Sequence, residues 1–265
     1  MCSPIRQCKT GHSICDQCFV RIKKCPKCRG PKSEARSFTL EAIASRIQLP
    51  CRYGNMGCTY SAKGDTIASH EKNCRYGPIF CPFKTYDQCT WSGYIAKLKN
   101  HCAKKHRNNF YSRGKQKFLA KNFNGIKSYH YIYVIIHAYD EYFRLTWELD
   151  NTTGVTKWAL YYMGTEEMSK KFFYKIEFPL DPDSRKHEGT RNLVWMSPCD
   201  VLPADDSIKF VKHNYLMLQR KLLNTYCDAN GDLNYTACIY KDDNIDESEA
   251  EIDSDSELLP AKFFE

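Results

Sequence analysis

The C-terminal half of the chain consists of short segments rich in aromatic and β-branched residues, and in parts of them apolar and polar positions alternate. This composition favours β-strands, which we expect at residues 129–139, 142–149, 155–163, 171–178 and 234–240. Turn residues separate several of these segments, for example at 151–154. Short strands with turns at this interval predict an antiparallel β-sandwich over residues 115–240, with the aromatic residues in its core.

Helical periodicity occurs at two places outside these strands. Residues 31–50 predict a linker with a short amphipathic helix, for which Thr39 is a candidate cap and Pro50 lies beyond the end. The apolar positions of this helix recur at helical spacing, at Leu40, Ile43, Ala44 and Ile47. Residues 207–223 predict a strand that leads into a helix, because their leucines do not alternate cleanly.

The length and composition limit the class of protein. A chain of 265 residues can form two or more small domains with at least one hydrophobic core. It has no run of about 18 apolar residues, so we expect no transmembrane helix and no membrane partner. Its first residues, MCSPIRQCKT, lack the apolar region of a secretory signal. These features favour a cytoplasmic or nuclear location.

Charge is distributed unevenly along the chain. The formal net charge is +8, but residues 242–257 contain nine acidic residues and no basic one. The rest of the chain therefore holds 39 basic against 22 acidic residues. Because the acidic segment has few apolar residues, we expect a disordered, solvated tail over residues 241–265. The basic remainder could attract nucleic acid or an acidic protein surface, or its lysines could balance the thiolates of metal sites.

Cysteine and histidine are spaced as metal ligands in the N-terminal 106 residues. The chain has 15 cysteines, and in the absence of an export signal this pattern favours zinc over disulfides. Residues 1–30 contain the run Cys8-x3-His12-x2-Cys15-x2-Cys18-x6-Cys25-x2-Cys28. This run matches the last six ligands of an eight-ligand, two-zinc cross-brace of the RING type, so residues 1–30 predict a partial RING finger.

In a cross-brace, the ligand pairs alternate between two zinc ions. One site is then complete and consists of Cys8, His12, Cys25 and Cys28. The pair Cys15 and Cys18 provides half of the other site, whose first pair would lie before Met1. Cys2 could supply a third ligand to that site, although it lies only six residues from Cys8.

Two further ligand sets follow in tandem over residues 51–106. They are Cys51, Cys58, His70 and Cys74, then Cys81, Cys89, His101 and His106. In each set the second pair has a helix-like spacing, which lets two side chains on successive helical turns bind one metal ion. The segment therefore predicts a double zinc finger. We interpret Cys102 as a neighbour of a ligand, and Cys199, Cys227 and Cys238 as core thiols.

These stretches resemble the seven-in-absentia (SINA) family of RING-type ubiquitin ligases. The resemblance is carried by QCKTGHSICDQC (7–18), CPKCRGP (25–31), LPCRYGNMGC (49–58), HEKNC (70–74) and CTWSGYIAKLKNH (89–101). It extends more weakly to YYMGT (161–165), HEG (187–189) and NGDLNYTACI (230–239), and in all spans about residues 4–240.

The resemblance implies an E3 ubiquitin-protein ligase that marks proteins for proteasomal degradation. In the family, the RING recruits a ubiquitin-charged E2 enzyme and supplies no nucleophile. The double zinc finger and a TRAF-like β-sandwich bind substrates that carry a short degron, and the sandwich forms a homodimer. By this resemblance Pro26 would line the E2-binding groove, and Arg29 would bond to both E2 and ubiquitin. Arg29 could equally be an ordinary surface arginine.

The absent ligand pair leaves three explanations open. The sequence could be shortened, it could be a natural form that binds substrates without transferring ubiquitin, or it could act through one zinc site or a dimer partner. A non-catalytic adaptor that blocks intact ligases is therefore an alternative function. Nucleic-acid binding is a weaker alternative, because DNA-reading fingers have a shorter first Cys-Cys spacing than the six and seven residues found here.

Overall fold

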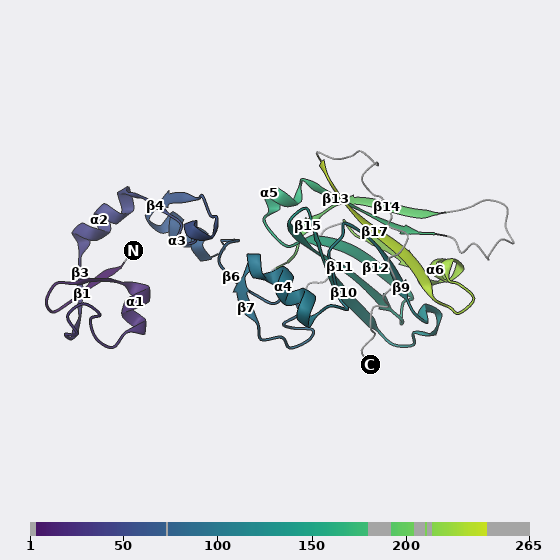
Figure 1. The fold of residues 1–265 in the computed structure, drawn as a ribbon, viewed down its shortest axis with the longest axis horizontal. Helices are drawn as coiled ribbons and strands as arrows, with labels where there is room; N and C mark the ends of the chain where they lie inside the picture. Colours follow the sequence, from purple (N-terminus) through teal and green to yellow (C-terminus); the bar gives the residue numbers. More distant parts are fainter. Residues whose placement is uncertain (1–3, 73, 180–191, 204–209, 211–213, 243–265) are drawn as a thin grey trace. The chain divides into compact units, whose positions relative to one another are not determined.

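The structure is a computed structural model that describes residues 4–72, 74–179, 192–203, 210 and 214–242 (Figure 1). The chain divides into two units. The first comprises Met1–Cys81 and Thr90–Lys97, and the second comprises Pro82–Cys89 and Leu98–Glu265. Among the described residues, no helix combines the length and apolar character needed to cross a membrane.

The first unit begins with a three-stranded antiparallel sheet in the order β2-β1-β3. Its elements are β1 (Ile5–Cys8), β2 (Ser13–Cys15), the helix α1 (Asp16–Arg21) and β3 (Lys32–Arg36). A small core made of Cys8, Ile14, Phe19 and Cys25 holds them together. Strand β3 lies in the segment that we expected to be a linker, because its backbone completes the sheet begun by β1.

Helix α2 (Phe38–Arg46) occupies the predicted helical segment, but two expectations about it are wrong. The residue at its N-cap is Ser37 rather than Thr39, and it makes no side-chain capping bond. No residue of α2 is buried, and Ile43 remains 46% exposed. The apolar spacing predicted the helix correctly, yet in the described structure the apolar residues do not enter a core.

Two ββα fingers follow. The first contains β4 (Gln48–Pro50), β5 (Ser61–Lys63) and α3 (Gly64–Lys72), and the second contains β6 (Pro78–Phe80), β7 (Ser92–Tyr94) and α4 (Ile95–Lys105). In each finger the two strands form an antiparallel hairpin, and the helix follows the second strand directly. This arrangement brings a knuckle between the strands close to the helix.

Two β-sheets form the second unit. One has the order β15-β12-β11-β10-β8, with β16 also paired to β12, and the other has the order β14-β13-β17-β9 (Figure 1). The first sheet contains β8 (Phe110–Tyr111), β10 (His130–Ala138), β11 (Glu141–Asp150), β12 (Val155–Tyr162), β15 (Asp200–Val201) and β16 (Leu216–Gln219). The second contains β9 (Lys115–Ala120), β13 (Phe172–Phe178), β14 (Leu193–Pro198) and β17 (Leu233–Lys241). Short helices lie at α5 (Glu166–Ser169) and α6 (Arg220–Leu223).

Aromatic side chains from both sheets form one core between them. Strand β13 alternates buried and half-buried positions along its length, as expected for a strand with one face in a core. Trp158 is fully buried; it stacks on Trp147 at 5.0 Å and meets the edge of Tyr235 at 4.6 Å. The predicted β-sandwich, with its aromatic residues in the core, is therefore confirmed.

The predicted strands correspond to β10, β11, β12, β13 and β17, and the strand-to-helix segment contains β16 followed by α6. The purely antiparallel expectation is wrong at two edges, because β8 pairs in parallel with β10 and β15 pairs in parallel with β12. The predicted acidic tail lies outside the described residues beyond Asp242.

Candidate metal centres

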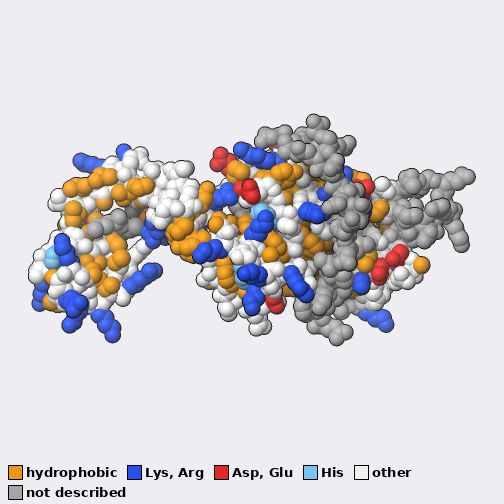
Figure 2. Space-filling view, viewed as in Figure 1, with side chains coloured by type: hydrophobic (Ala, Val, Ile, Leu, Met, Phe, Trp, Pro, Cys, Tyr) orange, Lys and Arg blue, Asp and Glu red, His pale blue; other side chains and the backbone are white. Residues whose placement is uncertain are grey.

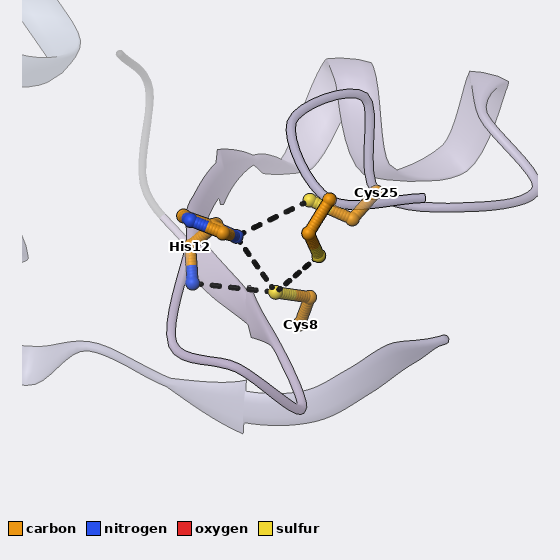
Figure 3. A group of neighbouring side chains, drawn as sticks. Cys8, His12 and Cys25 are labelled. Atoms are coloured by element: carbon orange, nitrogen blue, oxygen red, sulfur yellow. Dashed lines mark hydrogen bonds between the residues drawn. The ribbon is translucent and has the colours of Figure 1, made fainter. Parts of the chain in front are cut away.

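The complete RING-type ligand set comes together in the first unit. Ligand atoms of Cys8, His12, Cys25 and Cys28 all lie within 4.8 Å of one another. Cys8 is at the end of β1, His12 is in the turn before β2, and the other two thiols lie in the knuckle after α1. Figure 3 shows Cys8, His12 and Cys25 pointing toward one another. The histidine faces the thiols through Nδ1, at 3.5 Å from Cys8 Sγ and 3.8 Å from Cys25 Sγ.

Sequence reasoning did not identify Thr10, which lies in the same turn. Its hydroxyl is 2.9 Å from Cys8 Sγ and 3.1 Å from Cys28 Sγ. This hydroxyl lowers the pKa of the Cys8 thiol to about 6 and also lowers the pKa of Cys28. Hydrogen bonds that the protonated His12 ring donates to Cys28 and Cys8 raise the pKa of this histidine. Since zinc binds thiolate, a hydroxyl donor between two ligand cysteines favours the ligand form.

The first finger brings together Cys51, Cys58, His70 and Cys74. His70 is on α3, its Nε2 lies 3.3 Å from Cys58 Sγ, and Tyr60 stacks on its ring at 4.1 Å. The knuckle between the first two cysteines turns at Gly57, whose φ of 109° is readily accessible to glycine. Burial raises the pKa of the Cys74 thiol to about 11, so a bound cation is needed to hold this buried sulfur as thiolate at neutral pH.

The second finger brings together Cys81, Cys89, His101 and His106. His101 lies on α4 and His106 follows directly after this helix. His101 Nε2 lies 3.5 Å from Cys89 Sγ. Burial lowers the pKa of His101, and burial also lowers that of His106 against the opposing effect of Asp87. Both rings are thereby favoured in the neutral form that coordinates metals.

The separations between these ligand atoms fit zinc. A tetrahedral ion with Zn–S near 2.3 Å and Zn–N near 2.05 Å places two sulfurs about 3.8 Å apart, and a sulfur and a nitrogen about 3.6 Å apart. Cys8 and Cys28 are 3.8 Å apart, as are Cys51 and Cys74. The sulfur–nitrogen pairs reported above range from 3.3 to 3.8 Å. All three donor sets consist of thiolate and imidazole, the ligands of closed structural zinc sites.

The remaining predicted RING residues lie outside these clusters. Cys15 and Cys18 are close to each other, and a hydrogen bond that the Cys18 thiol donates to Cys15 raises the pKa of Cys18. Among the described residues, no third Cys, His, Asp or Glu joins this pair in a ligand group. Pro26 and Arg29 are both exposed, on the knuckle that carries the last two ligands. The Arg29 N–H donates to Cys25 O at 2.8 Å, and its φ is 57°.

The other cysteines are mostly internal. Cys102 is fully buried on α4, and Cys199 and Cys238 are each 3% exposed. Burial raises the pKa of Cys199 and Cys238, which keeps these thiols protonated. Cys227 is half-buried against the sandwich core. Cys2 lies outside the described residues.

Two family models match this chain. The model described as Sina, zinc finger matches residues 42–119, and the model described as E3 ubiquitin-protein ligase sina/sinah, RING finger matches residues 1–28. Together they cover the three ligand clusters, and they support zinc as the bound metal.

Curated relatives are similar over most of this chain. The E3 ubiquitin-protein ligase siah-1 of Caenorhabditis briggsae is 27% identical over 79% of this chain and 50% of the relative. The E3 ubiquitin-protein ligase DIS1 of Oryza sativa subsp. japonica is 27% identical over 84% of this chain and 72% of the relative. The E3 ubiquitin-protein ligase SINAT4 of Arabidopsis thaliana is 28% identical, over 78% and 65% respectively. The chain thus spans about half the length of the first relative.

Proposed function

Because this chain belongs to the Sina family, we propose that it is a RING-type E3 ubiquitin-protein ligase that promotes ubiquitin transfer from an E2 enzyme to bound substrate proteins. The names of its relatives support this activity. One structural observation carries the proposal: a complete four-donor cluster closes the knuckle on which Pro26 and Arg29 are exposed. A zinc site with reduced thiolates also suits a cytoplasmic or nuclear location.

We assign the twelve clustered residues as zinc ligands, four for each ion. Bound zinc would fix the fold of each small module. The assignment of Cys15 and Cys18 to a further site rests on their mutual proximity alone. Measurement of zinc content provides a direct check, since three filled clusters correspond to three ions per chain.

The proposed reaction requires no nucleophile from this chain. The amine of a substrate lysine attacks the thioester carbonyl between ubiquitin and the E2, an isopeptide bond forms, and the E2 cysteine leaves as its thiol. The ligase contributes by holding the two reactants in a productive geometry and by placing positive charge beside them. In this scheme Pro26 contacts the E2, and the Arg29 guanidinium donates hydrogen bonds to both the E2 and ubiquitin.

The positive φ of Arg29 makes a sharp test possible. Glycine adopts this backbone conformation more readily than arginine, so Arg29→Gly removes the cation while leaving the knuckle unstrained. Discharge of ubiquitin from a loaded E2 onto free lysine should fall at least about tenfold in Arg29→Gly and recover partly in Arg29→Lys. Zinc content should be unchanged in both variants. Equal activity of Arg29→Gly and the wild type would refute the role of the guanidinium.

Substrate binding is proposed along the first residues of β10, beside a cavity of the second unit. In the described structure β8 pairs with β10 at Ile135 and Ile136, and an extended degron would lie along the part of the strand that precedes this pairing. A cavity of about 420 Å³ opens here, lined by Tyr86, Asp87 and residues 129–132. Tyr129→Ala should weaken degron-peptide binding while leaving E2 discharge onto free lysine unchanged.

Homodimer formation is proposed through β14, which is an edge strand of its sheet among the described residues. Val194 and Met196 project from it and are 51% and 57% exposed. Burying both side chains against a second copy would remove this apolar surface from water. Met196→Asp should convert dimer to monomer in sedimentation velocity.

A non-catalytic adaptor is the second candidate, because among the described residues Cys15 and Cys18 belong to no ligand group of three or more Cys, His, Asp or Glu side chains. The two functions separate in one reconstituted reaction with E1, E2, ubiquitin and zinc. Ubiquitin transfer that is lost in Cys25→Ser supports the ligase. Absence of transfer by the wild-type chain, with degron binding retained, would establish the adaptor.

A further inference from the structure

The segment between Lys104 and Lys117 carries a concentration of positive charge within the second unit. It includes six basic residues and no acidic one. They are Lys104, Lys105, Arg107, Arg113, Lys115 and Lys117. The segment runs from the last turn of α4 through β8 into β9, and all of these side chains except the half-buried Lys115 belong to exposed residues. Figure 2 shows Lys and Arg side chains gathered over the region of α4.

Part of this charge is unpaired within the described structure. Lys104, Lys105 and Arg107 form no ion pair with any acidic residue of the described ranges. Lys99, one turn earlier on α4, lies near His137, which Asp140 and Glu141 also approach. It lies outside the segment 104–117, and we do not include it in the cationic face, which we define as the six basic residues of that segment.

The strand that leads into the acidic segment borders this face. Strand β17 pairs with β9 so that Cys238 is opposite Lys115, and the Ile239 N–H donates to Gly114 O at 2.8 Å. The described chain ends three residues later at Asp242, whose N–H donates to Lys171 O. The acidic run therefore begins three residues beyond the point at which β17 borders the cationic face.

Chain length permits contact between the two. Gly114 is ten residues from Lys104, so these positions are at most about 36 Å apart. An extended chain from Ile239 to Asp253, in the second half of the acidic run, spans roughly 46–50 Å. Nine carboxylates on a segment without basic residues complement six cations on a segment without acidic residues.

We propose that residues 242–257 bind the cationic face of the same chain and compete there with external polyanions such as nucleic acid. The contact is electrostatic, so it strengthens at low ionic strength and is lost in concentrated salt. It would keep a basic surface from retaining acidic macromolecules until another ligand displaces the acidic segment. This inference does not depend on ligase activity.

Cross-linking tests the contact directly. A carbodiimide that joins carboxylates to amines should link residues 242–257 to Lys104, Lys105, Lys115 or Lys117 within one chain at about 10 mM salt, where the screening length is about 30 Å, and should fail at about 1 M. Lys121 and Lys127, which follow the far end of β9, are the internal control. Equal cross-linking to the control lysines, or cross-links only between chains, would overturn the proposal.

A competition experiment tests the consequence. Replacing the nine acidic residues with their amides should raise the affinity for a labelled duplex oligonucleotide at least about tenfold at low salt. Lys104→Glu with Lys105→Glu should abolish this gain, whereas Lys121→Glu with Lys127→Glu, an equal change in net charge, should retain most of it. Unchanged affinity after neutralisation, or equal losses in the two lysine pairs, would contradict a specific contact.

Discussion

The carboxylate of Asp87 lies 3.0 Å from Nδ1 of His106 and leaves Nε2 of that ring to face the second finger's other ligands. The His106 side chain is 5% exposed and packs against Phe83 at 4.5 Å, whereas the Asp87 side chain is 54% exposed. A carboxylate on the far nitrogen of a ligand imidazole fixes the tautomer and the orientation of the ring. Asp87 therefore positions a ligand without being one.

Replacing Asp87 with asparagine should weaken zinc binding by the second finger. The amide cannot hold the imidazole as strongly as the carboxylate, and loss of such an outer contact typically costs about 10–100-fold in metal affinity. Competition with a chromogenic chelator measures the change. Asp140→Asn is a matched control, because Asp140 is exposed and its φ of 56° suits asparagine. An unchanged zinc affinity in Asp87→Asn would show that Phe83 and the backbone orient His106 without the carboxylate.

Arg220 should be a major stabilising residue of the sandwich. Its guanidinium donates to the carbonyls of Ile126, Phe123 and Asn124 and to the Asn151 side chain. Arg220→Met removes these charge-assisted bonds and leaves carbonyls without their donor, so unfolding free energy should fall by about 2–3 kcal/mol. Arg220→Lys keeps the positive charge but loses the planar guanidinium and its several donors, so it should recover only part of the lost unfolding free energy. Urea denaturation followed by near-ultraviolet circular dichroism provides the measurement.

Truncating Trp158 should destabilise the core more strongly. The side chain is fully buried among Trp147, Phe178 and Tyr235, and Trp158→Ala leaves a large cavity that costs about 3–5 kcal/mol. The exposed Met217 on β16 serves as a control, since Met217→Ala should change stability by no more than about 0.5 kcal/mol. Similar urea midpoints for the two variants would mean that the ring stack contributes little.

The turn after β11 should give a pH-dependent contribution to stability. Thr153 Oγ1 donates to Asp150 Oδ2 at 2.9 Å, and this bond, with the Thr152 N–H, lowers the pKa of Asp150. A carboxylate with a depressed folded pKa stabilises the fold above the unfolded value near 3.8. That contribution disappears as the pH falls through the folded pKa.

Thr153→Val should therefore raise the pKa of Asp150 and reduce stability at pH 7. The difference from wild type should shrink as the pH falls below about 3.8, and it should vanish below the depressed folded pKa of wild type, where Asp150 is protonated in both chains. Carboxyl NMR titration follows the pKa, and urea midpoints follow stability. Thr85→Val, at an exposed position in the second finger, should shift neither. A stability difference that persists at pH 2 would assign the effect to packing instead.

Local sequence patterns anticipated the clustered residues better than their surroundings. A short knuckle and a helical turn determine where Cys58 and His70 meet, so spacing alone suffices to bring them together. Thr10 and Asp87 are not predictable from the sequence, because a threonine or aspartate between ligands has no distinctive spacing. Their role depends on which way the turn directs one hydroxyl or one carboxylate.

Tertiary context explains the differences in the fold. Strand β9 is difficult to predict from the sequence, because its lysines mask an alternation in which Phe118 and Ala120 face the core. The spacing of the apolar residues in α2 predicts a helix, but it does not predict whether these residues are buried. Burial depends on which element packs beside the helix. The parallel pairings of β8 and β15 join residues too distant in sequence for local patterns to reveal.

The position of β17 between β13 and β9 sets an order for assembly during synthesis. Each metal cluster uses ligands within one short stretch, so it can close soon after that stretch leaves the ribosome. Strand β9 ends at Ala120, but its partner in the sheet is not complete until Lys241. At a synthesis rate of about 5–20 residues per second, roughly 6–24 s pass between the synthesis of β9 and the completion of β17. During this interval the nascent chain exposes an unpaired strand edge. Folding of the β-sandwich therefore needs chaperone protection more than folding of the metal-binding modules does.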